Sequence, residues 1–180
     1  MFSVERFSFD NMECDGAVVE LQAFRGERNE YLVKEFAAVD INTNCSVVIL
    51  FAPPYDRERL CLKTQRTNEW LQRHYHRLRW DDGNVSYKDM VRTVVQICSR
   101  FSVLYSKGLE KTNFLRQYHG NVIDLNDLFA PCVRRTFFSS IVQCPILQHQ
   151  QRPGVQCALR NALFYTDWLR ERHRTCSAVV

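Results

Sequence analysis

Three strand-like patterns follow one another at the start of the chain, and helix-like and strand-like patterns alternate after them. The strand patterns cover residues 17–24, 31–41 and 45–54, and only short polar connections separate them. Strands that are joined by such short turns pair with their neighbours in antiparallel fashion. We therefore predict an antiparallel meander over the first part of the chain.

The spacing of apolar residues then changes to that of helices. Four later segments have a helical period, with Thr64 and Ser86 at positions typical of N-caps for the first two, and two short apolar segments have the length of strands. The predicted helices cover 64–78, 86–101, 107–119 and 157–173, and the predicted strands cover 101–106 and 121–125. This order predicts an α/β protein with a mixed five-stranded sheet and helices on both faces. The arrangement resembles the RNase H-like fold of 3′–5′ exonucleases.

Length and composition fit one folded domain. The chain has 180 residues, of which 46% are hydrophobic and 12% aromatic, as in ordinary globular domains. No segment approaches the roughly 18 consecutive apolar residues of a membrane span. The first residues include acids where a signal peptide is apolar. We expect a single domain over residues 1–180, with an N-terminal extension (1–15) and a tail (174–180), that is intracellular, in the cytoplasm or nucleus, and contacts no membrane.

If the resemblance to exonucleases extends to their activity, an acidic residue is expected at each of four positions. Such enzymes hold two metal ions with four carboxylates, which come from the first strand (two), the helix after the fourth strand and the last helix. The corresponding residues here are Glu20, Gln22, Glu110 and Asn161. An amide is a poor substitute for a charged carboxylate that binds a hard cation. We therefore predict that these positions are degenerate and that the chain is not a two-metal exonuclease.

The segment CPILQHQQRPGVQC, residues 144–157, gathers candidate metal ligands. Cys144, His149 and Cys157 offer two thiolates and an imidazole, and Cys132 lies close enough in sequence to offer a third sulfur. With a fourth ligand, such a set makes a closed tetrahedral zinc site of structural type. In the alternative interpretation, the two end cysteines are buried thiols that act as small hydrophobic residues, and His149 is a surface residue.

Together with Glu35, this segment resembles the MAEL domain of Maelstrom proteins, which act in the animal piRNA pathway. The resemblance spans residues 17 to 172. It rests on the stretch YLVKEFAAVDI, which contains Glu35, and on Cys144, His149 and Cys157, with CALRNALFY at the start of the last helix. The chain has Cys-x4-His where these domains usually have Cys-x2-His.

The resemblance implies a set of properties. These are an RNase H-like fold without the exonuclease acids, a metal site made of Glu35, Cys144, His149 and Cys157 that holds structural zinc, and binding of single-stranded RNA. Some such domains also cleave RNA without a metal, so weak metal-independent cleavage is an expectation as well. The expected partners are single-stranded RNA and proteins of the silencing pathway.

A basic segment with interleaved aromatic residues is the best candidate for an RNA-binding surface. The net charge of +4 neither requires nor excludes nucleic acid, so the local distribution of charge decides. Arginines bind phosphates, and aromatic rings stack on unpaired bases. For Trp70, we favour packing in the core over stacking. The candidate residues are Arg66, Arg73, Arg77 and Arg79 for phosphates and Trp70, Tyr75 and Trp80 for bases.

Three functions follow from these patterns. The favoured one is a MAEL-like RNA-handling module of small-RNA silencing. The second is a protein-interaction scaffold built on a nuclease fold that has lost its chemistry. The third is an active metal-dependent 3′–5′ exonuclease that uses Glu20, Glu110 and a further acid such as Asp124 or Asp167.

Overall fold

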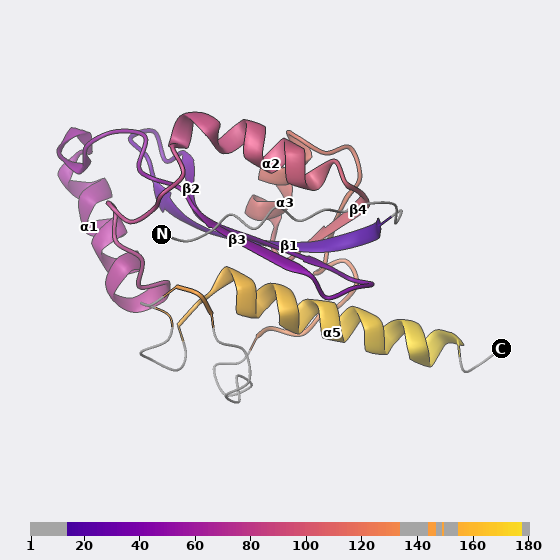
Figure 1. Cartoon of the computed structure of the whole chain (residues 1–180). Helices are drawn as coiled ribbons and strands as arrows, with labels where there is room; N and C mark the ends of the chain where they lie inside the picture. The colour runs from indigo at the N-terminus through magenta and orange to yellow at the C-terminus, as the bar shows by residue number, and fades with distance from the viewer. Residues whose placement is uncertain (1–13, 134–143, 147–148, 150–154, 178–180) are drawn as a thin grey trace.

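The antiparallel meander predicted for the start of the chain forms one side of a central sheet. The computed structural model describes residues 14–133, 144–146, 149 and 155–177 (Figure 1). The first two strands pair from Ala17 opposite Asp40 to Arg25 opposite Tyr31, and the second strand pairs with the third in the same antiparallel sense. The strands are β1 (Cys14–Arg25), β2 (Tyr31–Asp40) and β3 (Ser46–Leu50).

Two further strands lie on the other side of β1 and run parallel to it. They are β4 (Phe101–Ser106), which pairs with β1, and β5 (Val122–Asp124), which pairs with β4. The sheet order is therefore β3-β2-β1-β4-β5. The prediction of an α/β protein with a mixed five-stranded sheet is confirmed, and the arrangement is consistent with an RNase H-like fold.

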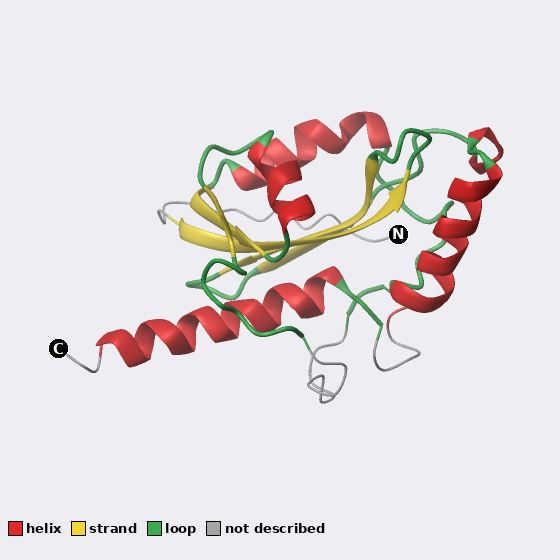
Figure 2. Cartoon of the chain, turned by 180° about the vertical axis from the view of Figure 1, so that it is seen from behind, coloured by secondary structure: helices red, strands yellow, loops and turns green. Residues whose placement is uncertain are grey.

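Helices cover both faces of the sheet, as predicted. Helices α2 and α3 lie on one face, α5 crosses the other, and α1 stands at the end of the sheet (Figures 1 and 2). Within the described residues, no helix is both long and apolar enough to cross a membrane. The helices are α1 (Leu62–Trp70), which a π-helical turn (Leu71–Tyr75) continues, α2 (Met90–Cys98), α3 (Leu109–Arg116) and α5 (Ala158–Ser177), and 3-10 turns lie at Arg57–Arg59 and Tyr87–Asp89.

Neither predicted N-cap is used. The helix expected from residue 64 begins at Leu62, and the Thr64 hydroxyl contacts Cys61 Sγ at 3.2 Å. Ser86 precedes a 3-10 turn rather than α2 and makes no side-chain capping bond. These two predictions were wrong because α1 begins two residues before Thr64, where the N–H of Cys61 bonds to Glu27 Oε1 at 2.9 Å, and because a 3-10 turn lies between Ser86 and α2.

Two element ends also differ from the prediction. The strand expected over 45–54 ends at Leu50, since the N–H of Ala52 bonds to the C=O of Val85 at 2.8 Å instead of continuing the ladder. The last helix continues to Ser177 and so includes part of the expected tail. The expected N-terminal extension covers residues 1–15. Its residues 1–13 lie outside the described part of the chain, and β1 begins at Cys14.

The sheet separates two apolar cores. Side chains alternate along β1, so Val19 packs with residues of α2 and α3, whereas Val18 packs with residues of α5. The core beneath α5 also contains Cys144 and Cys157. The candidate ligands are therefore interior residues, and their environment is set by the contact of α5 with the sheet.

Candidate metal centre

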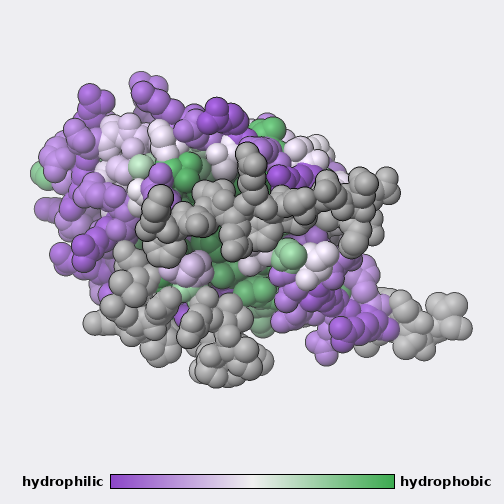
Figure 3. All heavy atoms as spheres, in the orientation of Figure 1, coloured by the Kyte–Doolittle hydropathy of each residue, from purple (hydrophilic) through white to green (hydrophobic). Residues whose placement is uncertain are grey.

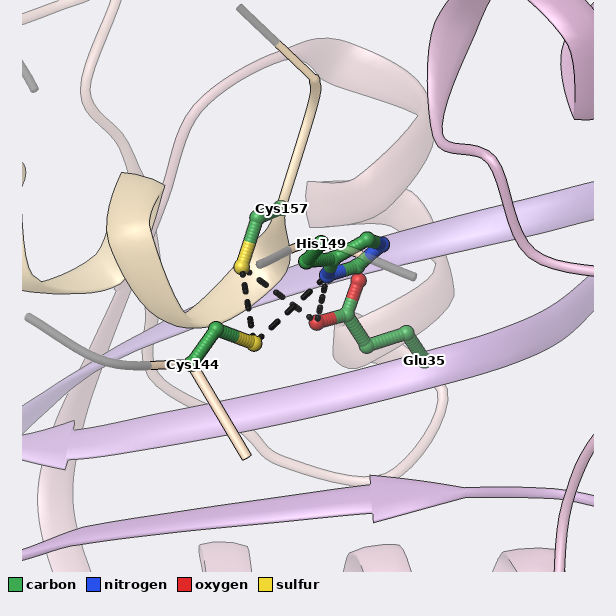
Figure 4. A group of neighbouring side chains, drawn as sticks. All are labelled: Glu35, Cys144, His149 and Cys157. Atoms are coloured by element: carbon green, nitrogen blue, oxygen red, sulfur yellow. Dashed lines mark hydrogen bonds and ion pairs between the residues drawn. The ribbon is translucent and has the colours of Figure 1, made fainter. Parts of the chain in front are cut away.

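Four candidate ligands meet in the core beneath α5, and we call them the four-ligand group. Glu35 comes from β2, Cys144 and His149 come from the segment before α5, and Cys157 directly precedes α5. Their carboxylate, imidazole and sulfur atoms point toward one another (Figure 4). All four side chains are buried, and one ligand atom from each lies within 4.8 Å of the others. The structure thus brings the four predicted residues together.

Glu35 joins the group through the register of the sheet. It lies in a middle strand, opposite Gln22 of β1 and Leu50 of β3. A buried carboxylate is costly unless it has partners. Glu35 Oε2 accepts a hydrogen bond from the N–H of Ala158 at 3.1 Å, at the start of α5, where the helix dipole favours negative charge. Its other oxygen, Oε1, faces the sulfur of Cys157 at 3.7 Å.

Four of the six separations between ligand atoms match those around a tetrahedral ion, and the other two are at most 4.8 Å. The two sulfurs are 3.5 Å apart, and Cys144 Sγ lies 3.6 Å from His149 Nδ1. Glu35 Oε1 lies 3.7 Å from both His149 Nδ1 and Cys157 Sγ. Bonds of about 2.0–2.3 Å around tetrahedral Zn²⁺ separate ligand atoms by about 3.3–3.8 Å. The group could therefore hold a metal ion and is compatible with zinc.

His149 presents Nδ1 to the group because its other nitrogen is occupied. Nε2–H donates to the C=O of His76 at 2.7 Å, and the C=O of His149 accepts a bond from Arg160 at 3.1 Å. Metal-binding histidines commonly donate their second N–H in this way, which sets the tautomer and the ring orientation. His149 is fully buried, so the interpretation of His149 as a surface residue is wrong.

The ligands of the group differ in how readily they lose the protons that a bound cation would replace. Burial raises the pKa of Glu35 to about 7, and nearby His149 opposes the rise. The hydrogen bond between the sulfurs lowers the pKa of Cys144 to about 5 and, with burial, raises the pKa of Cys157. Burial lowers the pKa of His149, but its bond to Cys144 and the charge of Glu35 outweigh burial and raise it. One thiolate thus lies among protonated ligands, and a metal ion would replace their protons.

Cys132 does not belong to this site. Its side chain is exposed, and the group of possible ligands found in the described part of the chain contains Glu35 instead. The alternative in which Cys132 is the fourth ligand is therefore not supported. Since all four positions of the group are protein ligands, a bound ion would have no open position for a reactive water, as in structural zinc sites.

The former exonuclease positions on β1 and α5 are buried but are not a set of acids. Glu20 Oε1 accepts the N–H of Lys107 at 2.9 Å, and Oε2 pairs with the ammonium group of Lys111. Gln22 and Asn161 are buried as well, and Gln22 Nε2 and Asn161 Oδ1 have no hydrogen-bond partner among the described residues. A lysine cation thus neutralises the carboxylate that a metal ion would need.

The other acids considered for catalysis lie apart or are occupied. Glu110 is on α3, its side chain is 51% exposed, and it pairs with Arg25 at the end of β1. Asp124 is buried, and its Oδ1 accepts the N–H groups of Gly108 and Asn126 at 3.1 and 2.8 Å. Asp167 is exposed on α5. The structure does not gather these acids into a group with Glu20.

The basic segment lies on the surface of α1 and the turn that follows it. Arg66, Arg73 and Arg79 are exposed and Arg77 is half-buried. None of the four forms an ion pair with a described residue, whereas Glu69, the acid of this helix, pairs with Arg57. Hydrophilic residues cover this end of the molecule, at the left of Figure 3.

Three aromatic side chains of this segment form a surface that we call the aromatic platform: Trp70, His74 and Tyr75. The Trp70 and Tyr75 rings are stacked, with centroids 6.4 Å apart and an interplanar angle of 24°, and the His74 ring lies 5.9 Å from Trp70. Trp70 is 55% exposed, so the prediction that it packs in the core is wrong. Trp80 is the buried tryptophan, in a cluster with Phe24, and therefore cannot stack on a base.

The exposure of Trp70 has a local cause. Asn68 is the buried residue of α1, and its side chain accepts from the N–H and donates to the C=O of Arg25, both at 2.8 Å. These bonds turn the Asn68 face of α1 toward β1. Trp70, two positions further on, is then about 200° around the helix and faces outward.

His76 contacts the candidate site, which the sequence did not indicate. It lies within the basic segment, yet its ring is fully buried, and its C=O accepts the bond from His149. Its Nδ1 accepts the N–H of Leu78 at 3.1 Å, and burial lowers its pKa to about 3, so the ring is neutral. No pattern distinguished it from its exposed neighbour His74, because its burial depends on contacts with distant residues.

Comparisons with protein-family models, with curated proteins and with solved structures gave no match to this chain. The assignment of the site therefore rests on its residues and on the distances between their ligand atoms.

Proposed function

We propose that this chain is a MAEL-like RNA-handling module of small-RNA (piRNA) silencing, which binds single-stranded RNA and lacks two-metal exonuclease chemistry. The observation that carries the proposal is the four-ligand group. The Glu-Cys-His-Cys set of the MAEL resemblance lies within 4.8 Å in a sheet and helix arrangement consistent with an RNase H-like fold. The degenerate exonuclease positions support the same proposal, since Lys111 neutralises Glu20.

In this proposal, structural zinc held by Glu35, Cys144, His149 and Cys157 fastens the start of α5 to β2. The ion would join residues that are 122 positions apart in the sequence. The module acts inside the cell, in the cytoplasm or nucleus, with silencing-pathway proteins as partners.

The aromatic platform and the arginines around it are the proposed RNA-binding surface. Arg66 lies one helical turn before Trp70, and Arg73 lies within the turn after it, so cations flank the exposed rings. Bases stack on such rings without sequence preference, and arginines hold the phosphates between them. Because Trp80 is buried, Trp70 and Tyr75 are the stacking residues of the proposal.

Charge reversal tests the surface directly. In the triple variant Arg66→Glu, Arg73→Glu and Arg79→Glu, we expect the affinity for a labelled single-stranded RNA to fall at least about tenfold. The slope of log affinity against log salt should shrink by about 2, since each lost phosphate contact contributes about 0.7 for single strands. Fluorescence anisotropy at several salt concentrations measures both quantities.

The control is Arg92→Glu on α2, an exposed arginine on a helix that covers a face of the sheet, whereas the basic segment lies at the end of the sheet. It should leave RNA affinity unchanged. Equal RNA affinity in the triple variant and the wild type would reject this surface. If the wild type binds no RNA but retains protein partners after RNase treatment of a cell extract, the scaffold function replaces the proposed one.

A further inference from the structure

Two backbone hydrogen bonds join the four-ligand group to the aromatic platform. His149 Nε2–H donates to the C=O of His76 at 2.7 Å, and the N–H of Gln156 donates to the C=O of Tyr75 at 3.0 Å. His149 is itself a candidate ligand, and Gln156 directly precedes the ligand Cys157. The last residue of the platform and the residue after it are therefore bound by the segment that carries the ligands.

The geometry of the platform depends on an irregular helical turn. The N–H of His76 bonds to the C=O of Leu71 at 3.1 Å, which closes the π-helical turn over Leu71–Tyr75. Such turns are rare and often occur at functional sites. If the turn relaxes to an α-helical one, Tyr75, five positions after Trp70, moves to about 140° from Trp70 around the helix axis. The stacking of Tyr75 on Trp70 therefore requires that the π-helical turn persists.

Little apolar burial holds this turn in place. None of the residues Leu71–Tyr75 is buried, and the one buried residue of α1 is Asn68. His76, just after the turn, is buried, and its ring packs edge-on against Phe24 with centroids 4.8 Å apart. His76 is thus the anchor at the C-terminal end of the turn, and its carbonyl is the group that His149 binds.

We propose that zinc in the four-ligand group sets the conformation of the aromatic platform and thereby the affinity for single-stranded RNA. An ion would hold His149 and Cys157 together, and this would keep the donors of His149 and Gln156 against the carbonyls of His76 and Tyr75. Without the ion, these donors separate and the turn relaxes. The effect on RNA rests on the proposed function, whereas the effect on the turn does not.

Coupling of this kind is reciprocal. If zinc raises the affinity for RNA by some factor, single-stranded RNA must raise the affinity for zinc by the same factor, because both describe one coupling free energy. Zinc titration with and without RNA therefore measures the same quantity as RNA titration with and without zinc. Agreement between the two factors distinguishes coupling from an indirect effect of zinc on solubility or aggregation.

The test uses the whole chain with zinc, after chelation and after zinc is added back. Hydrogen exchange should show that the amides of residues 71–76 exchange about tenfold faster after chelation, while those of the β1–β2 ladder change little. The affinity for single-stranded RNA should fall at least about fivefold. Cys144→Ser should reproduce both changes, and Cys98→Ser, an equally buried cysteine on the opposite face of the sheet, should cause neither.

The possible results separate the two proposals. Unchanged exchange at residues 71–76 in a folded, zinc-free chain overturns the coupling, whatever the RNA result. An increase in exchange that is the same at residues 71–76 and in the β1–β2 ladder also overturns the coupling, because zinc then stabilises the fold as a whole. Faster exchange confined to residues 71–76, in a chain that binds no RNA in either state, supports the effect of zinc on the turn and refutes the proposed RNA function.

Discussion

Two side chains of the four-ligand group, Glu35 and His149, each contact both the candidate site and a neighbouring part of the chain. Glu35 Oε2 accepts a bond from the first turn of α5, while Oε1 faces the candidate ligands. His149 Nε2 binds the carbonyl of His76, while Nδ1 faces the group. Each of these residues therefore connects the candidate site to a different element. A substitution at either one should alter the structure of that element as well as the site.

The protonation of these residues predicts how zinc affinity depends on pH. Without metal, the pKa of Cys157 is raised by its bond to Cys144 and by burial, that of Glu35 is about 7, and that of His149 is raised despite burial. All three must be deprotonated to bind an ion, so binding releases protons and affinity increases with pH. We expect at least about a tenfold gain per pH unit around neutral pH, since Cys157 alone releases one proton and His149 and Glu35 add to the slope.

Competition with a chromophoric zinc chelator between pH 6 and 8 measures this dependence, after correction for the protonation of the chelator. Cys144, whose pKa is about 5, is already a thiolate between pH 6 and 8 and adds no slope in this range. An affinity that is constant between pH 6 and 8 would mean that the group does not bind the ion through these residues.

At the scale of elements, α1 is held to the sheet by polar contacts more than by apolar ones. Asn68 bonds to both backbone groups of Arg25, and no apolar residue of α1 is buried. The helix therefore presents Trp70 to solvent, where it forms the aromatic platform with His74 and Tyr75 of the π-helical turn. A helix attached in this way is sensitive to the loss of one amide.

Asn68→Ala should destabilise the chain by about 1–3 kcal/mol, because it leaves two backbone groups of Arg25 without their partner. Urea unfolding followed by circular dichroism measures the change. Asn113→Ala, at an exposed position of α3, is the control and should change stability by less than about 0.5 kcal/mol. A loss for Asn68→Ala that does not exceed the control would show that α1 is attached by other contacts.

At the scale of the whole molecule, the mixed sheet is consistent with an RNase H-like fold, and the polar residues beneath α5 have partners other than metal ions. Glu20 is bound by Lys107 and Lys111, and Gln22 and Asn161 are neutral. The four-ligand group lies on the same face of the sheet, at the start of α5. This face of the sheet therefore carries a neutralised carboxylate, two amides and a group that could hold a metal ion.

We therefore expect Mg²⁺ or Mn²⁺ to cause no 3′–5′ digestion of a labelled single strand by the purified chain. Two-metal catalysis needs charged carboxylates at the positions of Gln22 and Asn161, and an ion would have to displace Lys111 from Glu20. Gel analysis of the products checks this, with Glu20→Gln as the comparison. Digestion that depends on the divalent ion and is abolished in Glu20→Gln would establish the active exonuclease instead.

Much of the fold was predictable because its elements have regular periods. The meander, the two later strands and the helices on both faces follow from the spacing of apolar residues, which reflects local backbone geometry. The ends of elements were less predictable. Thr64 and Ser86 have the right chemistry for N-caps, yet the helices begin elsewhere, since contacts with neighbouring segments decide where a helix starts.

The residue types of the candidate site could be predicted from the sequence, but the burial and contacts of the residues around it could not. Two cysteines and a histidine close in sequence indicate zinc, and the family resemblance added Glu35 rather than Cys132. The exposure of Trp70, the burial of Trp80 and the role of His76 were not predictable, because each depends on a partner far along the chain. For Trp70, that partner is Arg25, which binds Asn68 from 43 positions away.

By itself, the sequence determined the order of strands and helices, the amides at positions 22 and 161 and the chemical types of the candidate ligands. Periodicity and residue identity are local properties, so the sequence carries them directly. Only the tertiary structure decided that Glu35 meets Cys157, 122 positions away, and that His149 binds the carbonyl beside the aromatic platform. Strand register and the docking of α5 set those contacts, and both arise from the packing of the whole chain.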